Sequence, residues 1–156
     1  MTLKLIPVFL FVLTLTAGSA IAAEAAAPTA KDRCPVCGMF VAPYADWVAT
    51  ISFKDGSHLF FDGCKDLFRY YFDLPEAGEK LSRKQIESIM VTEYYSTRKM
   101  KVSDVFFVVG SDVFGPMGKE LIPVAGEKTA ATFMRDHKGT EMLTFEQVKP
   151  AKLPGE

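Results

Sequence analysis

Two cysteines and a methionine stand close together in the segment CPVCGM, which runs from Cys34 to Met39. Thiolate and thioether sulfur atoms are soft ligands, which suit copper(I), and thiolates also bind zinc. Three chemistries are consistent with such a segment: dithiol electron exchange, zinc coordination, and a copper(I) site. The rest of the chain is needed to choose among them.

Zinc would need two more ligands, and the sequence offers Cys64 and His58. Zinc sites with three cysteines and one histidine are tetrahedral, and the spacing of CPVC, His58 and Cys64 allows one. Cys64 is also open to interpretation as a buried thiol, which we favour, or as a disulfide partner. His58 begins a predicted strand, and we expect its side chain to face solvent or to pair with a carboxylate rather than to bind a metal ion.

Copper(I) is satisfied by two or three soft ligands, and the sequence supplies two further thioethers for it. Met117 lies between Gly115, Pro116 and Gly118, in a loop where a methionine has no apolar core to fill, so we predict that it is a ligand. Met39 precedes the apolar Phe40 and is read equally well as a ligand or as a core residue.

The pair Cys34 and Cys37 has two other interpretations. A structural disulfide is one alternative in an oxidising compartment. A redox-active C-x-x-C pair is another, with thiol pKa values lowered at a helix N-terminus. Such a pair follows a buried strand and opens a helix, whereas this one follows a short polar leader and precedes a predicted strand, which argues against thiol-disulfide exchange.

The first residues have the pattern of a secretory signal. Lys4 is followed by an apolar run and by small residues with an A-x-A exit, so we predict a cleaved signal peptide at 1–23 and a flexible leader at 24–31. No cysteine stands at the cleavage region to carry a lipid, and no second apolar run follows. We therefore expect a soluble periplasmic protein with no integral membrane segment after cleavage.

Charge and length narrow the class further. The chain of 156 residues has a formal net charge of -1, and loss of Lys4 with the signal makes it more negative by one unit. No basic stripe or phosphate-binding glycine loop is present, so nucleic acid is not an expected partner. Residues 32–150 suit one domain or two small subdomains, and 151–156 reads as a tail.

Hydrophobic periodicity predicts the elements that must position the sulfur atoms. The first part reads as a β-hairpin followed by a helix with Asp62 as its N-cap, and the second part reads as two strands, a helix and a last short strand. This order predicts an α+β fold of two ββα units packed together, the first at 32–80 with the CPVCGM knuckle and the second at 81–150 with the GPMG loop. The individual segments are strands at 47–53, 58–61, 90–96, 104–110 and 140–145, helices at 64–72 and 126–137, a short helix or irregular connector at 81–89, and a loop at 114–124.

Four motifs carry a resemblance to a known family. They are CPVCGM at 34–39, FFDG-x-KD-x-F-x-YYF at 60–72, FGPMGKELIP at 114–123 and FMRDHKG at 133–139. Together they resemble the NosL family of nitrous-oxide reductase accessory proteins, and the N-terminal half also looks like metal-binding modules of the YHS and TRASH type. Cys64 departs from the NosL pattern, in which that position is commonly not cysteine.

The resemblance implies a copper(I) metallochaperone rather than an enzyme. Its implied partner is an acceptor copper enzyme, nitrous-oxide reductase or the machinery that matures it. We expect Cys37 to bind the ion with Cys34, Met39 and Met117, and rank Cys64, His58 and His137 lower. His137 ends a predicted helix, where its interaction with the helix dipole is a sufficient explanation. A structural zinc module and a thiol-disulfide oxidoreductase remain the alternatives.

Overall fold

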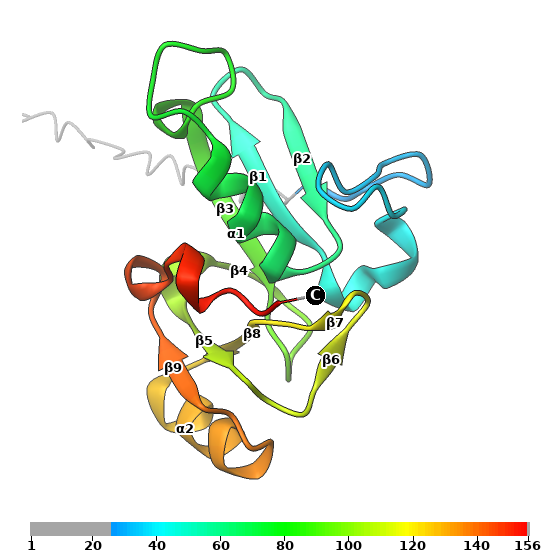
Figure 1. Ribbon diagram of the computed structural model, residues 1–156. Coiled ribbons are helices and arrows are strands. Elements are labelled where there is room, and N and C mark those ends of the chain that lie inside the picture. Colours follow the sequence, from blue (N-terminus) through cyan, green and yellow to red (C-terminus); the bar gives the residue numbers. More distant parts are fainter. Residues whose placement is uncertain (1–25, 156) are drawn as a thin grey trace, which may run out of the picture.

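Two antiparallel sheets, each with a helix packed on it, form the part of the chain that the computed structural model describes, residues 26–155 (Figure 1). The first sheet has the strand order β2-β1-β3-β4 and the second has the order β8-β5-β9. The strands are β1 Ala49–Phe53, β2 His58–Phe61, β3 Ile86–Thr92, β4 Lys99–Lys101, β5 Val105–Val109, β8 Ile122–Ala125 and β9 Glu141–Leu143. The predicted α+β class is confirmed.

The expected β-hairpin and first helix are both present. Strands β1 and β2 pair antiparallel through the turn after Phe53, where Asp55 accepts the backbone N–H of Ser57 and Gly56 takes a positive φ of 83°. Helix α1, Cys64–Asp73, then crosses the sheet, and the ring of its buried Phe68 also contacts Phe107 on β5 of the second sheet. The buried Leu67 and Phe68 recur at the helical spacing that the sequence showed.

The expected ββα repeat required the strands after α1 to start a second unit. They do not. Strand β3 pairs with β1 on one side and with β4 on the other, so both strands extend the first sheet. Residues 86–89, expected as a short helix or connector, form the first half of β3; only residues 83–85 are helical. The reason is the alternation of Ile89 and Val91, which point into the core as successive inward residues of a strand.

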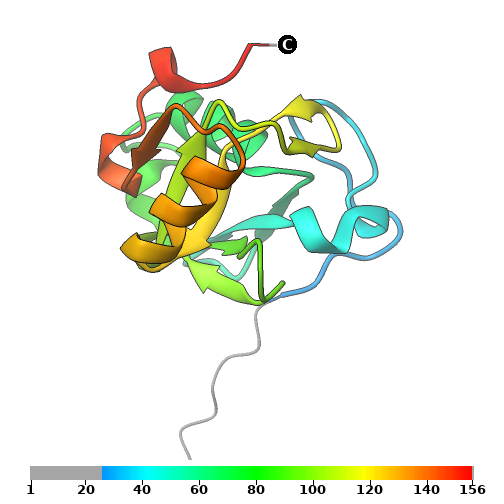
Figure 2. The ribbon, with the colours of Figure 1, turned by 90° about the horizontal axis from the view of Figure 1, so that it is seen from below.

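The second sheet carries helix α2, Glu127–Asp136, across its strands, as Figure 2 shows from below. Phe133 and Ala130 on α2 are fully buried and pack with Val108 of β5 and with Ile122 and Val124 of β8. The strand predicted at 104–110, the helix at 126–137 and the strand at 140–145 are therefore confirmed with slightly shorter bounds.

The loop expected at 114–124 contains a small hairpin and the first residues of β8. Strands β6 Phe114–Gly115 and β7 Gly118–Lys119 pair with each other, and Pro116 and Met117 form the turn between them. Gly118 adopts a φ of 85°, a conformation that side chains disfavour. Lys65, in the first turn of α1, donates a hydrogen bond from its ammonium group to the Met117 carbonyl at 2.9 Å, so this hairpin lies beside the start of α1. Figure 1 labels both strands of the hairpin.

Within residues 26–155, five short 3-10 helices accompany these elements. They are Ala42–Trp47, Arg83–Gln85, Val102–Asp104, Phe145–Gln147 and Pro150–Lys152. The predicted signal peptide at 1–23 lies outside the described residues. Among the residues that are described, no helix is long and apolar enough to cross a bilayer.

Candidate metal centre

The CPVCGM segment folds back on itself as a tight knuckle. The N–H of Cys34 donates to the carbonyl of Met39 at 2.8 Å, and the N–H of Gly38 donates to the carbonyl of Cys34 at 2.9 Å. Gly38 has a φ of 78°, which a residue with a side chain rarely adopts. An isolated β-bridge between Arg33 and Phe40 closes the turn. Both thiols therefore lie inside a loop held by its own backbone.

Two carboxylates meet these thiols at the start of α1. One ligand atom from each of four side chains lies within 4.8 Å of the other three, and the four are Cys34, Cys37, Asp62 and Asp66. The Cys34 thiol donates to Asp66 Oδ2 at 3.3 Å, and the Cys37 thiol donates to Asp62 Oδ1 at 3.4 Å. Sulfur and carboxylate oxygen atoms at this separation form a group that can hold a metal ion.

Asp62 is the member that the sequence misassigned. The N-cap of α1 is Gly63, and no side chain caps that helix end, so the predicted capping role of Asp62 is wrong. Its carboxylate turns towards Cys37 instead, and its Oδ2 is buried without a hydrogen-bond partner among the described residues. A buried oxygen atom without a partner is costly, and binding a cation is one reason to keep it there.

Asp66 and its neighbours set the charge around the group. Asp66 is buried and forms an ion pair with Arg69 at 3.5 Å, and Lys65 is also buried beside it. Burial raises the pKa of both cysteine thiols, and hydrogen bonding to the carboxylates adds to that rise. The thiols therefore keep their protons at neutral pH until a metal ion displaces them.

Each of the two predicted thioether ligands lines a cavity together with Cys37. Met117 is 45% exposed and faces a cavity of about 220 Å³ that Cys37 also lines. Met39 and Cys37 share a second, more open hollow with Phe40. The cavity of about 220 Å³ is lined by Val36, Cys37, Lys65, Asp66, Arg69 and Met117. The structure thus brings the knuckle and the GPMG turn together, although they are far apart in sequence.

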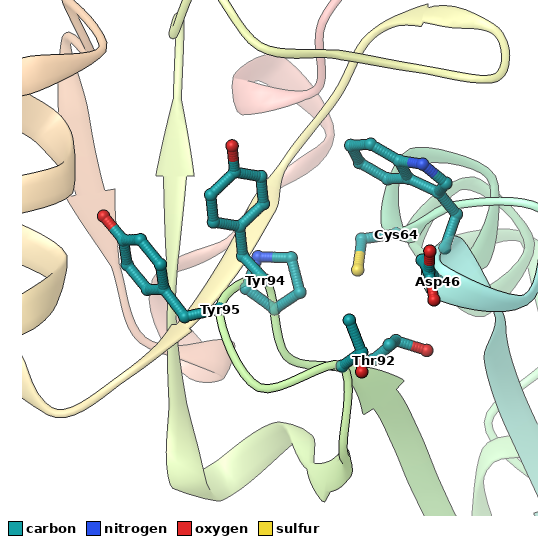
Figure 3. A pocket seen from close by; sticks show the side chains of 8 residues that line it. Asp46, Cys64, Thr92, Tyr94 and Tyr95 are labelled. Atoms are coloured by element: carbon teal, nitrogen blue, oxygen red, sulfur yellow. The ribbon is translucent and has the colours of Figure 1, made fainter.

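The lower-ranked candidates lie elsewhere. Cys64 is a buried thiol, as favoured, and its sulfur faces a separate cavity beside Asp46, Thr92 and Tyr94 (Figure 3). His58 is exposed and hydrogen-bonds the Ser52 hydroxyl at 2.9 Å.

His137 ends α2, where it contacts Asp112 at 3.3 Å and stacks on Phe133. None of Cys64, His58 and His137 belongs to a metal-competent group among the described residues, so the site with three cysteines and His58 is not formed.

All three cysteines are free, so the structure contains no Cys34–Cys37 disulfide. The remaining methionines behave as expected, since Met100, Met134 and Met142 pack against the two cores. What the sequence did not reveal is the pair of carboxylates. Asp62 and Asp66 are four residues apart across the start of a helix, and that spacing was the available signal.

The fold and the site together define an α+β protein with a thiol and carboxylate group that can hold a metal ion. Comparison with family models then gives the family: the NosL model matches residues 25–153. The chain belongs to the NosL family. A comparison with curated proteins found no significant match.

Solved structures of two NosL proteins are among those similar to this chain. The crystal structure of the copper chaperone NosL from Shewanella denitrificans has a TM-score of 0.68 and 21% sequence identity, over 82% of this chain and 97% of that one. The solution structure of the apo-NosL protein from Achromobacter cycloclastes has a TM-score of 0.48 and 22% identity, over 67% and 87% of the two chains. At this identity, the first likeness supports the fold.

Proposed function

We propose that this protein is a periplasmic metallochaperone that binds one copper(I) ion and passes it to an acceptor copper enzyme. The observation that carries the proposal is the cavity shared by Cys37 and Met117, because it joins a thiol to an exposed thioether. Copper(I) favours this pairing of soft ligands, whereas zinc has no use for a thioether. Membership of the NosL family and the likeness to a solved copper chaperone support the same conclusion.

Each residue of the site has a defined part in this proposal. Cys37 and Cys34 supply thiolates, and Met39 and Met117 supply thioethers, each from a cavity that Cys37 also lines. The carboxylates of Asp62 and Asp66 accept the thiol hydrogen bonds, so each stands where a proton leaves when the ion binds. Transfer needs no catalytic base or nucleophile, so we propose no enzymatic activity.

The surroundings of the site suit transfer to another protein. Four of the large apolar side chains that remain exposed belong to the knuckle or the GPMG hairpin: Val36, Phe40, Phe114 and Met117. An apolar rim around an accessible thioether allows an acceptor to dock and its ligands to enter before the donor ligands leave. By family resemblance we propose nitrous-oxide reductase or its maturation machinery as the acceptor, after cleavage of a signal peptide at 1–23.

Native mass spectrometry tests the proposal on the mature, reduced protein offered equal copper(I) and zinc(II). We expect one copper ion per chain in preference to zinc, and weaker copper binding in Met117→Ala. The matched control is Met142→Ala, which removes a packing thioether at the second core. Preference for zinc would overturn the copper proposal, and equal copper binding by both variants would overturn the assignment of Met117 as a ligand.

Zinc is the second candidate, because two thiols and two carboxylates form a mixed donor set that suits that ion. It would use Cys34, Cys37, Asp62 and Asp66, in place of the predicted Cys64 and His58. Thiol-disulfide exchange is disfavoured, because a redox nucleophile needs a lowered thiol pKa and burial raises both here. The likeness of the N-terminal half to YHS and TRASH modules stays a prediction.

A further inference from the structure

A buried glutamate joins the GPMG hairpin to the first turn of α1. Glu120 follows β7 directly, and only 4% of its surface is exposed. Its Oε1 accepts the backbone N–H of Lys65 and that of Leu121, the second at 2.8 Å. The carboxyl group lies against Gly63, where a Cβ atom would collide with its Oε2. The glycine at the N-cap of α1 therefore makes room for this side chain.

A second bond ties the same two segments together at the methionine itself. The ammonium group of Lys65 donates to the backbone carbonyl of Met117 at 2.9 Å. Gly115, on β6, also packs closely on the Glu120 side chain. We call the contacts of Glu120 with Gly63 and Lys65, and of Lys65 with Met117, the hairpin latch. The latch spans residue pairs more than fifty positions apart in sequence.

The hairpin is short and pairs with no other strand among the described residues. Its strands have two residues each, and such a short hairpin is marginally stable by itself. Phe114 and Met117 are both largely exposed, so they add little packing. The site, in contrast, needs the Met117 sulfur atom at a defined distance from Cys37. The contacts that hold the hairpin are therefore the contacts that set that distance.

We propose that Glu120 is a positioning residue for copper(I), which acts by holding Met117 over Cys37 through the hairpin latch. The inference rests on the proposed function, because it requires Met117 to be a copper ligand. Burial raises the pKa of Glu120 to about 8, so its carboxyl is mostly protonated at neutral pH. Glutamine is therefore a close replacement, since its Oε1 can accept the same two backbone N–H groups.

A double-mutant cycle tests the coupling by copper(I) affinity, measured in competition with a chromophoric chelator on the full mature chain. We expect Glu120→Ala to weaken binding about tenfold, in the range found for residues that orient metal ligands. Glu120→Gln should stay within about twofold of wild type. In a Met117→Ala background, Glu120→Ala should add less than about twofold, because the two changes remove the same interaction.

Stability is measured in parallel, because Glu120→Ala also removes a helix contact. Phe133→Leu is the matched control, since it disturbs the other core. It should lower the melting temperature with no change in copper affinity. If Glu120→Ala does not fold, Lys65→Met replaces it, because that change removes the bond to the Met117 carbonyl and keeps the side-chain stem. We expect a loss of affinity of about threefold or more, absent in the Met117→Ala background.

The outcomes separate the two proposals. Failure of the wild-type protein to bind copper(I), or no effect of Met117→Ala, would overturn the proposed ligand set and this inference with it. A normal effect of Met117→Ala together with an unchanged affinity in Glu120→Ala would overturn the inference alone. Equal losses from Glu120→Ala in both backgrounds would do the same, since they would show a structural role independent of Met117.

Discussion

Copper binding by this protein should release protons, and the structure gives the expected number. The Cys34 and Cys37 thiols have pKa values raised by burial and by hydrogen bonding to carboxylates, so both are protonated between pH 6 and 8. Thiolate is the form that binds the metal. Each proton that leaves makes the apparent affinity rise about tenfold per pH unit. Two thiols therefore predict a rise of about one to two decades per unit.

The range reflects how many of the two thiols ionise when the ion binds. Ionisation of both thiols gives the upper slope, and ionisation of one thiol gives the lower slope. In both cases affinity increases with pH, because each proton that leaves is held only by the metal-free state.

Chelator competition at a series of pH values measures this slope, and calorimetry in two buffers of different ionisation enthalpy counts the protons directly. In Cys34→Ala the slope should fall by about one decade per unit, because one titrating thiol is gone. A copper affinity independent of pH between 6 and 8 would refute the reasoning. It would mean that the thiols are already ionised in the metal-free protein, as in a redox-active pair.

Three further predictions concern stability. Asp62→Ala should stabilise the metal-free protein by about 1 kcal/mol in urea unfolding. It removes an unpartnered buried oxygen atom that costs about 1–3 kcal/mol, and the small cavity that it leaves offsets part of this gain; a lower free energy of unfolding would make Asp62 a structural residue. Burial raises the pKa of Glu120 from 4.5 to about 8, so the folded protein holds this proton more tightly than the unfolded chain does. The free energy of unfolding of the wild type, relative to Glu120→Gln, should therefore fall by up to about 5 kcal/mol as pH rises from below 4.5 through 8; parallel pH profiles of the two proteins would contradict this. Cys64→Ala should cost about 1 kcal/mol in the same assay and leave the copper stoichiometry at one per chain, and loss of metal would make Cys64 a ligand.

Local patterns predicted much of the fold. The hairpin at β1 and β2 and both helices follow from turn residues and periodicity, which act over short stretches of chain. The pairing of β3 with β1 did not follow, because strand pairing depends on contacts between distant segments. Residues 86–89 contain charged and polar positions that gave no clear alternation by themselves. Their conformation is fixed by the β1 strand beside them.

The site shows the same division between local and distant information. Cys34, Cys37 and Met117 were predicted from residue type and from the glycines around the methionine. Asp62 and Asp66 were not, because acidic residues at a helix start have an ordinary explanation in the helix dipole and in capping. Only their burial beside the thiols distinguishes them, and burial is a property of the folded chain.

The site is assembled from three separate stretches: the knuckle, the first turn of α1 and the GPMG hairpin. A chain that has not folded past Met117 has the two thiols of a flexible C-x-x-C peptide and no neighbouring thioether. With the proposed ligand set, metal binding therefore follows the docking of the C-terminal half, since the Met117 thioether reaches the thiols only then. Unfolding would separate the proposed ligands, so the bound ion would be held only while the tertiary structure is intact.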